Sequence, residues 1–132
     1  MAKYENYTCL IVDDFSTART IIKNILNELG FLCQEADDGE QAMATILQTS
    51  FNLVLADIKM PNKNGLELLE EIRNQDNLKD VPVILTMIEA NEEYISVGSE
   101  LGMNDYLIKP FDVFTLSKVL DKVIVTEGGE AL

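Results

Sequence analysis

Five side chains that could carry metal or phosphate chemistry stand at the ends of short apolar runs. Asp13 and Asp14 follow CLIV, Asp57 follows LVLA, Thr86 ends VILT and Lys109 ends YLIK. Carboxylates bind hard cations and attack phosphorus, while a hydroxyl and an ammonium stabilise charge on phosphoryl oxygens. If the fold brings these residues together, the set indicates phosphoryl transfer to a carboxylate.

The elements that must position these residues alternate along the chain. Apolar runs alternate with segments of helical period, which predicts an α/β fold: a three-layer, doubly wound, five-stranded parallel sheet. Right-handed crossovers then place the carboxyl ends of all strands at one edge, where ligands bind in open α/β sheets. The strands are predicted at residues 7–12, 32–36, 52–56, 82–86 and 105–109.

Like charges of Asp13, Asp14 and Asp57 would meet at that edge if the first and third strands are neighbours. Close carboxylates disfavour one another's ionisation unless a cation neutralises them. The chain has no His, and no Cys lies near these positions, so the ligands are oxygens and the indicated ion is Mg²⁺. Asp57 would then be the nucleophile, with Lys109 and Thr86 stabilising the phosphoryl oxygens.

The ordered motifs LIVDD, LADIKMPNKNG, VILT and YLIKPF cover nearly the whole chain. In this order and spacing the sequence resembles the receiver domains of bacterial two-component response regulators, most closely the single-domain CheY type. The resemblance implies the flavodoxin-like strand order 2-1-3-4-5. It also implies that the protein is a switch rather than an enzyme. The switch would take a phosphoryl group from a histidine kinase, a phosphotransfer protein or a small donor, and would lose it by autodephosphorylation.

The resemblance assigns roles to single residues. Asp57 would be the phosphoacceptor, and Asp14 and Asp57 would bind Mg²⁺ directly. Asp13 would act through water, and the backbone carbonyl of Lys59 would be the remaining protein ligand.

Further roles follow from the same resemblance. Lys109 matches the invariant lysine of the family and precedes Pro110 in what would be a cis peptide. Thr86 and Tyr106 match the switch pair. An unidentified downstream protein would bind the face made by the fourth helix, fifth strand and fifth helix, and chemotaxis is one candidate pathway.

Composition narrows the remaining possibilities. The 23 acidic and 10 basic side chains give a formal net charge of -13, which disfavours nucleic acid and anionic membranes as partners. No apolar run reaches the roughly 18 residues of a membrane span, and two Cys residues make a disulfide framework implausible. We expect a cytoplasmic protein with one receiver domain over residues 1–132, in which residues 125–132 form a frayed tail.

Two positions depart from the family pattern, and other functions stay open. Met87 replaces a usually small residue after the threonine, which suggests slow loss of phosphate from Asp57. Lys59 adds a cation at the cleft, where it would attract a phosphodonor or obstruct a phosphatase.

The alternative functions are a Mg²⁺-dependent phosphatase with an aspartate nucleophile, a receiver domain cut from a longer regulator, and a flavin- or nucleotide-binding protein. The last lacks a phosphate-cradling glycine loop.

Overall fold

The computed structural model describes residues 2–124 and contains the predicted parallel sheet. Its strand order is β2-β1-β3-β4-β5, as the family resemblance implied. The strands are β1 (Thr8–Val12), β2 (Leu32–Ala36), β3 (Leu53–Asp57), β4 (Val83–Met87) and β5 (Asp105–Ile108). The predicted tail, residues 125–132, lies outside the described residues.

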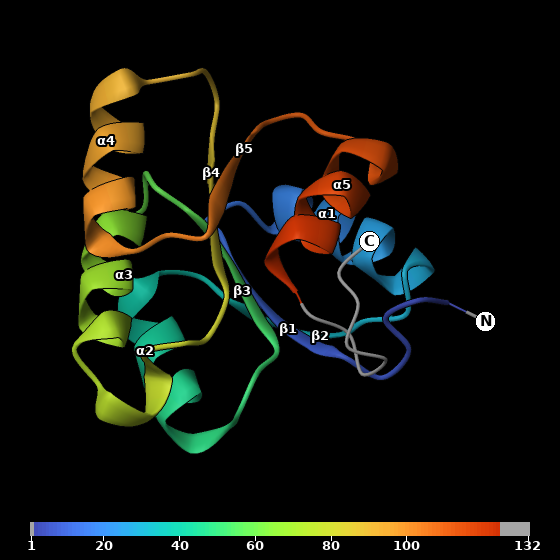
Figure 1. Ribbon diagram of the computed structural model, residues 1–132, viewed down its shortest axis with the longest axis horizontal. Helices are drawn as coiled ribbons and strands as arrows, with labels where there is room; N and C mark the ends of the chain where they lie inside the picture. Colours follow the sequence, from blue (N-terminus) through green and yellow to red (C-terminus); the bar gives the residue numbers. More distant parts are fainter. Residues whose placement is uncertain (1, 125–132) are drawn as a thin grey trace.

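Helices cover both faces of the sheet and complete the three predicted layers (Figure 1). One face carries α2, α3 and α4, and the other carries α1 and α5. The helices are α1 (Ser16–Glu28), α2 (Gly39–Gln48), α3 (Gly65–Arg73), α4 (Glu92–Leu101) and α5 (Val113–Val123), and a short 3-10 helix η1 (Asp76–Leu78) precedes β4. Within residues 2–124, no helix has the length and apolar character that crossing a membrane requires.

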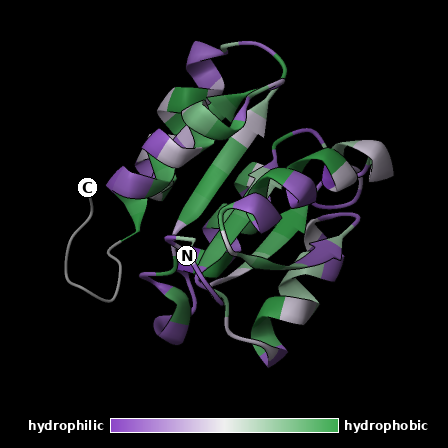
Figure 2. Ribbon diagram, turned by 90° about the vertical axis from the view of Figure 1, so that its right-hand side faces the viewer, coloured by the Kyte–Doolittle hydropathy of each residue, from purple (hydrophilic) through white to green (hydrophobic). Residues whose placement is uncertain are grey.

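The core has two halves, one on each side of the sheet. The strands are largely hydrophobic, whereas the helices carry their polar residues on the outside (Figure 2). Leu10, Val54 and Leu85 are fully or almost fully buried toward α2 and α3, and Ile11 and Ile84 are fully buried in the cluster that packs α1 and α5. Central strands buried on both faces explain why β3 and β4 read as continuous apolar runs.

Strand register fixes which residues meet at the carboxyl edge. Val12 of β1 lies opposite Ala56 of β3, so the chain places Asp13 beside Asp57 one residue later. Asp57 in turn lies opposite Thr86 of β4. The prediction that the first and third strands are neighbours is therefore confirmed.

Most helix starts follow ordinary capping chemistry. Asp38, Asn64, Asn91 and Asp112 each accept a hydrogen bond from a backbone amide in the first turn of their helix. At the start of α1, the apolar residues Phe15, Ala18 and Ile22 recur at helical spacing, so the sequence predicts that Phe15 belongs to the apolar stripe of this helix. In the structure, Phe15 is instead the N-cap residue of α1, makes no capping hydrogen bond with its side chain, and is 67% exposed.

Gly65 allows α3 to begin directly against the strand end that carries Asp57. Its amide donates to the carbonyl oxygen of Ile58 at 2.9 Å. A Cβ at this position would overlap the carbonyl oxygen of Asp57 and would lie 2.9 Å from Ile58 Cα. Neither contact involves a flexible side chain, so the backbone itself would have to move.

Gly65→Ala is therefore expected to lower the free energy of unfolding by about 2 to 3 kcal/mol, measured by urea denaturation. Gly98→Ala in α4 is the matched control, because its Cβ would meet Met103 Sδ, which can move aside. The control should change stability by at most about 1 kcal/mol, since alanine also favours the helix. Equal stability of Gly65→Ala and wild type would contradict this account of the turn.

Candidate functional site

Three carboxylates meet at the carboxyl edge of the sheet. One oxygen each from Asp13, Asp14 and Asp57 lies within 4.8 Å of the others. Asp13 and Asp57 are 1% and 7% exposed, whereas Asp14 is exposed. The three residues predicted from the sequence to form one acidic site are thus together.

The carboxylates differ in how their oxygens are engaged. Asp13 Oδ1 accepts from the Phe15 amide at 2.9 Å, and its Oδ2 accepts from Lys109 Nζ at 3.0 Å. Within residues 2–124, Asp14 makes no hydrogen bond or ion pair, and Asp57 Oδ1 has no donor. Asp14 and Asp57 therefore have free oxygens for a cation, while both oxygens of Asp13 are already used.

Lys109 provides the cation that faces this cluster. Its Nζ lies 3.0 Å from Asp13 Oδ2 and 3.4 Å from Asp57 Oδ2. Burial alone lowers the pKa of Lys109, but Asp13 and Asp57 outweigh that effect and raise the pKa above its usual value. Lys109 is therefore held as an ammonium between two carboxylates, and the peptide to Pro110 is cis, as expected.

Burial raises the pKa of Asp57 from its usual 3.8 to about 6. Lys109 opposes this rise, and the nearby charges of Asp13 and Asp14 add to it. One ammonium thus does not compensate three carboxylates. A divalent cation would, and oxygen ligands in this number are the kind that Mg²⁺ takes in proteins.

Thr86 holds a buried hydroxyl that lacks a partner. The residue is 1% exposed, and its Oγ1 finds no hydrogen-bond partner within residues 2–124. A buried polar atom of this kind is uncommon and calls for an explanation such as an incoming ligand. Thr86 lies directly opposite Asp57 in the sheet, so an acceptor bound at Asp57 would satisfy it.

Asp14 and Asp57 line a cleft of about 410 Å³ between the loops after β1, β3 and β4, and Lys109 also borders it. Its walls also contain Phe15, Ile88, Asn91 and Tyr94, which the sequence analysis did not assign to the site. Ile88 is 74% exposed and Phe15 is 67% exposed, so two large apolar side chains are open to solvent at this cleft. Tyr94 recurs with Val97 and Leu101 at helical spacing in the sequence, but such periodicity does not show which end of a helix borders a cleft.

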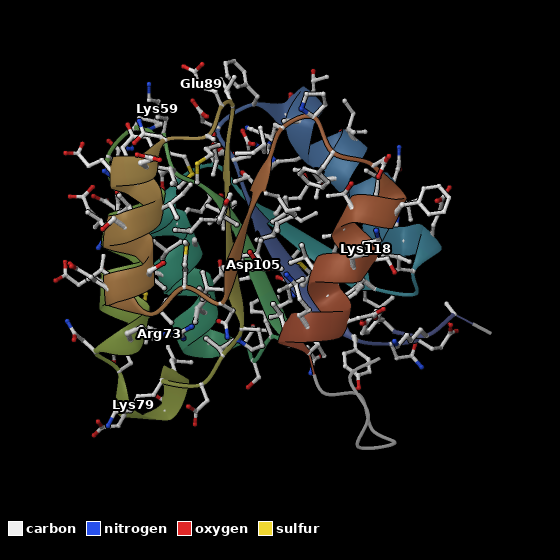
Figure 3. The ribbon with its side chains drawn as sticks, turned by 45° about the horizontal axis from the view of Figure 1, so that its top comes forward. Lys59, Arg73, Lys79, Glu89, Asp105 and Lys118 are labelled. Carbon is white, nitrogen blue, oxygen red and sulfur yellow. The ribbon has the colours of Figure 1, made fainter. Side chains whose placement is uncertain are left out.

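The two residues that depart from the family pattern both line this cleft. Met87 ends β4 and is 4% exposed, and it borders the same space as Asp57. Lys59 is exposed and lies with Glu89 at one end of the molecule, opposite Arg73 and Lys79 (Figure 3). Met87 thus restricts the cleft from inside, and Lys59 adds positive charge at its mouth.

Tyr106 does not line the cleft. It lies opposite Leu85 in the β4–β5 register, whereas Thr86 lies opposite Leu107. Because side chains alternate along a strand, Thr86 and Tyr106 start from opposite faces of the sheet. Tyr106 borders a separate surface hollow of about 450 Å³ between β5 and α5.

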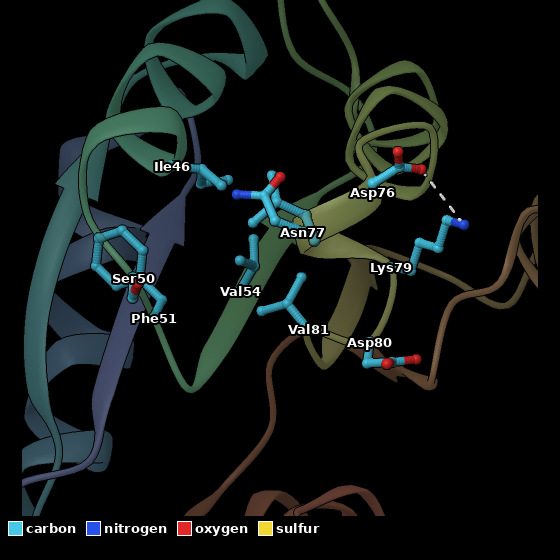
Figure 4. Close-up of a pocket in the computed structure, with 10 residues that line it drawn as sticks. Ile46, Ser50, Phe51, Val54, Asp76, Asn77, Lys79, Asp80 and Val81 are labelled. Carbon is cyan, nitrogen blue, oxygen red and sulfur yellow. Dashed lines mark ion pairs between the residues drawn. The ribbon is translucent and has the colours of Figure 1, made fainter.

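A further cavity of about 220 Å³ is lined by none of Asp13, Asp14 and Asp57 (Figure 4). It opens beside η1, where Phe51, Val54 and Val81 form apolar walls and Asp76 pairs with Lys79 at 3.4 Å. None of the residues named above as candidates for chemistry borders it. The cleft at Asp57 is therefore the candidate site.

Curated relatives match nearly the whole length of the chain. It is 44% identical over 120 residues to the chemotaxis protein CheY-3 of Vibrio cholerae, an alignment that covers 90% of this chain and 92% of that protein. It is 39% identical over 121 residues to the chemotaxis protein CheY of Pseudomonas aeruginosa, covering 91% and 98%.

Solved structures share the fold. Vibrio cholerae CheY4 superposes with a TM-score of 0.85 at 29% identity, covering 90% of this chain and 99% of that one. The receiver domain of the Pseudomonas aeruginosa sensor histidine kinase PA1611, which has a magnesium ion coordinated in its active site cleft, superposes with a TM-score of 0.82 at 30% identity, covering 89% and 97%. The family model of the response regulator receiver domain matches residues 9–121, and this chain belongs to that family.

Proposed function

We propose that Asp57 accepts a phosphoryl group from a histidine kinase or a phosphotransfer protein. The observation that carries this proposal is the buried carboxylate of Asp57, whose Oδ1 is free, whose Oδ2 pairs with Lys109, and which lies opposite the unpartnered hydroxyl of Thr86 in the sheet. A carboxylate needs no general base, because it is ionised above its pKa. The absence of His in the chain requires that the donor be another molecule.

The acidic cluster fits Mg²⁺. Asp14 and Asp57 would bind it directly, Asp13 through water, and the backbone carbonyl of Lys59 would complete the protein ligands. The free oxygens of Asp14 and Asp57, and the engagement of both Asp13 oxygens, support this division. The magnesium ion in the related PA1611 receiver domain supports the same site. When bound, the ion would neutralise charge on the phosphoryl oxygens.

The transfer itself needs only positioned charges. An oxygen of Asp57 forms a bond to phosphorus while the bond from phosphorus to the donor nitrogen or oxygen breaks, and the donor atom keeps the electron pair. Lys109 and Thr86 then hold oxygens of the acyl phosphate by an ion pair and a hydrogen bond. The protein acts as a switch whose only reactions are its own phosphorylation and dephosphorylation.

The output we propose is a change of the face formed by α4, β5 and α5. Thr86 moves toward the phosphoryl group, and the Tyr106 ring turns inward, which changes the surface around Ile95, Tyr106 and Val113 where a downstream protein binds. The chemotaxis proteins among its relatives support chemotaxis as the pathway. The free thiols of Cys9 and Cys33 support a cytoplasmic location, and the charge of -13 supports a protein rather than nucleic acid or a membrane as partner.

The alternative functions are not favoured. The receiver-domain match over residues 9–121 speaks against an aspartate-nucleophile phosphatase and against flavin or nucleotide binding. A single receiver domain over residues 1–132 stays a prediction.

Acetyl phosphate with Mg²⁺ should add one phosphoryl group to the wild-type protein, as seen by intact mass. Asp57→Asn and excess chelator should each abolish the adduct, because one removes the nucleophile and the other the cation. Asp76→Asn is the control, since this exposed aspartate borders another pocket and not the cleft at Asp57, and should leave the adduct unchanged. An adduct that persists in Asp57→Asn would place the acceptor elsewhere.

The raised pKa of Asp57 predicts a pH-dependent stability difference in Mg²⁺-free protein. Its folded pKa of about 6 exceeds the usual 3.8, so stability that is fully present below pH 3.8 is lost as pH rises through about 6. Asp57→Asn removes this loss. The free energy of unfolding of Asp57→Asn minus that of wild type should therefore increase by up to about 3 kcal/mol between pH 4 and pH 7. Urea titrations at several pH values measure it, and a constant difference would refute the electrostatic account.

Met87→Ala should speed loss of phosphate from Asp57 several-fold, because it opens the inner wall of the cleft to water. The decay of the phosphorylated protein is followed by intact mass after the donor is removed. Met43→Ala is the matched control, since Met43 is also 4% exposed but lies in α2 away from the cleft. Equal decay rates in Met87→Ala and wild type would remove the shielding role of Met87.

A further inference from the structure

The loop after β2 supplies no group to the cleft, yet it contacts the 58–64 loop directly and the Asp13–Asp14 loop through Arg19. We propose that residues 37–39, called here the 37–39 bracket, are positioning residues that hold the Asp13–Asp14 loop and the loop of residues 58–64 in register for the metal. This inference rests on the proposed Mg²⁺ site. It concerns how this chain's own residues keep that site in shape.

Asp38 makes the first contact of the bracket with the 58–64 loop. Its Oδ1 caps α2 by accepting from the Gln41 amide at 2.9 Å, and its Oδ2 accepts from Asn62 Nδ2 at 2.7 Å. The hydrogen bonds from Gln41 and then Asn62 hold the pKa of Asp38 below its usual value, so both bonds are made to a carboxylate. The Asp38 side chain thus connects the start of α2 to Asn62 in the 58–64 loop.

Asn62 is shaped for this contact by its backbone. It has a φ of +67°, one of only two positive φ angles among the described non-glycine residues. Such left-handed positions are tolerated mainly by Asn, Asp and Gly. The side-chain amide of Asn62 donates to Asp38, and Asn62 does not line the cleft at Asp57.

Gly39 makes a second, backbone contact to the same loop. Its amide donates to the carbonyl oxygen of Lys63 at 3.0 Å. A Cβ on Gly39 would lie only 2.5 Å from that oxygen, so the two backbones approach at a distance that excludes a side chain. The 58–64 loop is therefore fixed at residues 62 and 63 by the bracket, and at Ile58 by the Gly65 amide. Lys59 lies between these two anchors.

Arg19 of α1 connects the bracket to the Asp13–Asp14 loop. Its Nη1 donates to the carbonyl oxygen of Asp13 at 2.6 Å and lies 3.1 Å from Asp37 Oδ1. Its Nε donates to Glu35 Oε1 at 2.9 Å, and its side chain is 13% exposed. The guanidinium thus holds the backbone that precedes Asp14 against the end of β2.

The contacts on both sides imply a mechanical role for the bracket. A bound cation needs the Asp14 and Asp57 carboxylates and the Lys59 carbonyl at fixed separations, although they come from different loops. The bracket limits how far those loops move relative to each other in the metal-free protein. Its loss should therefore weaken Mg²⁺ binding without removing any ligand.

Two substitutions break the Asp38 to Asn62 contact selectively. Asn62→Gly keeps the left-handed backbone but removes the amide. Asp38→Ser keeps an N-cap oxygen but is too short to reach Asn62 as well. In calorimetric titrations each variant should bind Mg²⁺ about tenfold more weakly than wild type. In hydrogen exchange of the Mg²⁺-free proteins, amides within residues 58–64 should exchange faster.

Three further variants separate positioning from general loss of stability. Asp112→Ser alters the cap of α5 in the same way and should leave Mg²⁺ affinity and the exchange of residues 58–64 unchanged. Asp38→Asn should keep the wild-type Mg²⁺ affinity and the wild-type exchange of residues 58–64. The new side-chain amide at position 38 can donate to the side-chain oxygen of Asn62 once the Asn62 amide has turned. The double variant Asp38→Ser with Asn62→Gly should bind Mg²⁺ as weakly as each single variant, since the two substitutions remove the same contact.

Unchanged Mg²⁺ affinity and unchanged exchange in Asn62→Gly and Asp38→Ser would overturn the bracket. So would an equal effect of Asp112→Ser, because that result would indicate stability alone. If wild type takes up no Mg²⁺, the proposed function fails, and the exchange measured in metal-free protein still decides whether the bracket holds the loop.

Discussion

The repulsion among three carboxylates at one edge of the sheet is the interaction on which the rest depends. Lys109 lies between Asp13 and Asp57, yet burial and the neighbouring charges still raise the pKa of Asp57 to about 6. The folded chain keeps this unfavourable arrangement because the apolar strands around it are fixed by the core. A site with uncompensated charge and an unpartnered hydroxyl responds strongly when a cation and a phosphoryl group arrive.

The size of that response decides whether the fold can switch. Reversing a two-state equilibrium from 1:99 to 99:1 takes about 5.5 kcal/mol of differential interaction. Hydrogen bonds to charged groups contribute about 1.5 to 3 kcal/mol each, so the proposed bonds from Thr86 and Lys109 to a phosphoryl group would supply a large share. The Thr86 hydroxyl also begins without a partner, and its new bond replaces none within the described residues.

The sequence was sufficient for the fold and for the residues that meet, but not for what surrounds them. Asp13, Asp57, Thr86 and Lys109 lie at or directly after the carboxyl ends of their strands, and the parallel topology alone brings these ends to one edge. The family resemblance supplied the strand order. Phe15 was misplaced because its apolar character matched the helical period, although the helix starts one residue later. The pairing of Asp38 with Asn62 joins two loops, and no local pattern encodes such a contact.

The two ends of the molecule are held differently, which bears on where a change at Asp57 is felt. At the end away from the cleft, Arg73 Nε donates to the Gly102 carbonyl at 3.0 Å, and its Nη2 donates to Asn104 Oδ1 at 2.9 Å. The same Asn104 oxygen accepts from the Val83 amide at 2.8 Å, so the end of α4 is tied to α3 and to the start of β4. At the cleft end, α4 begins at an exposed loop with Asn91 as its cap. A displacement that starts at Thr86 therefore meets less resistance at the start of α4 than at its end.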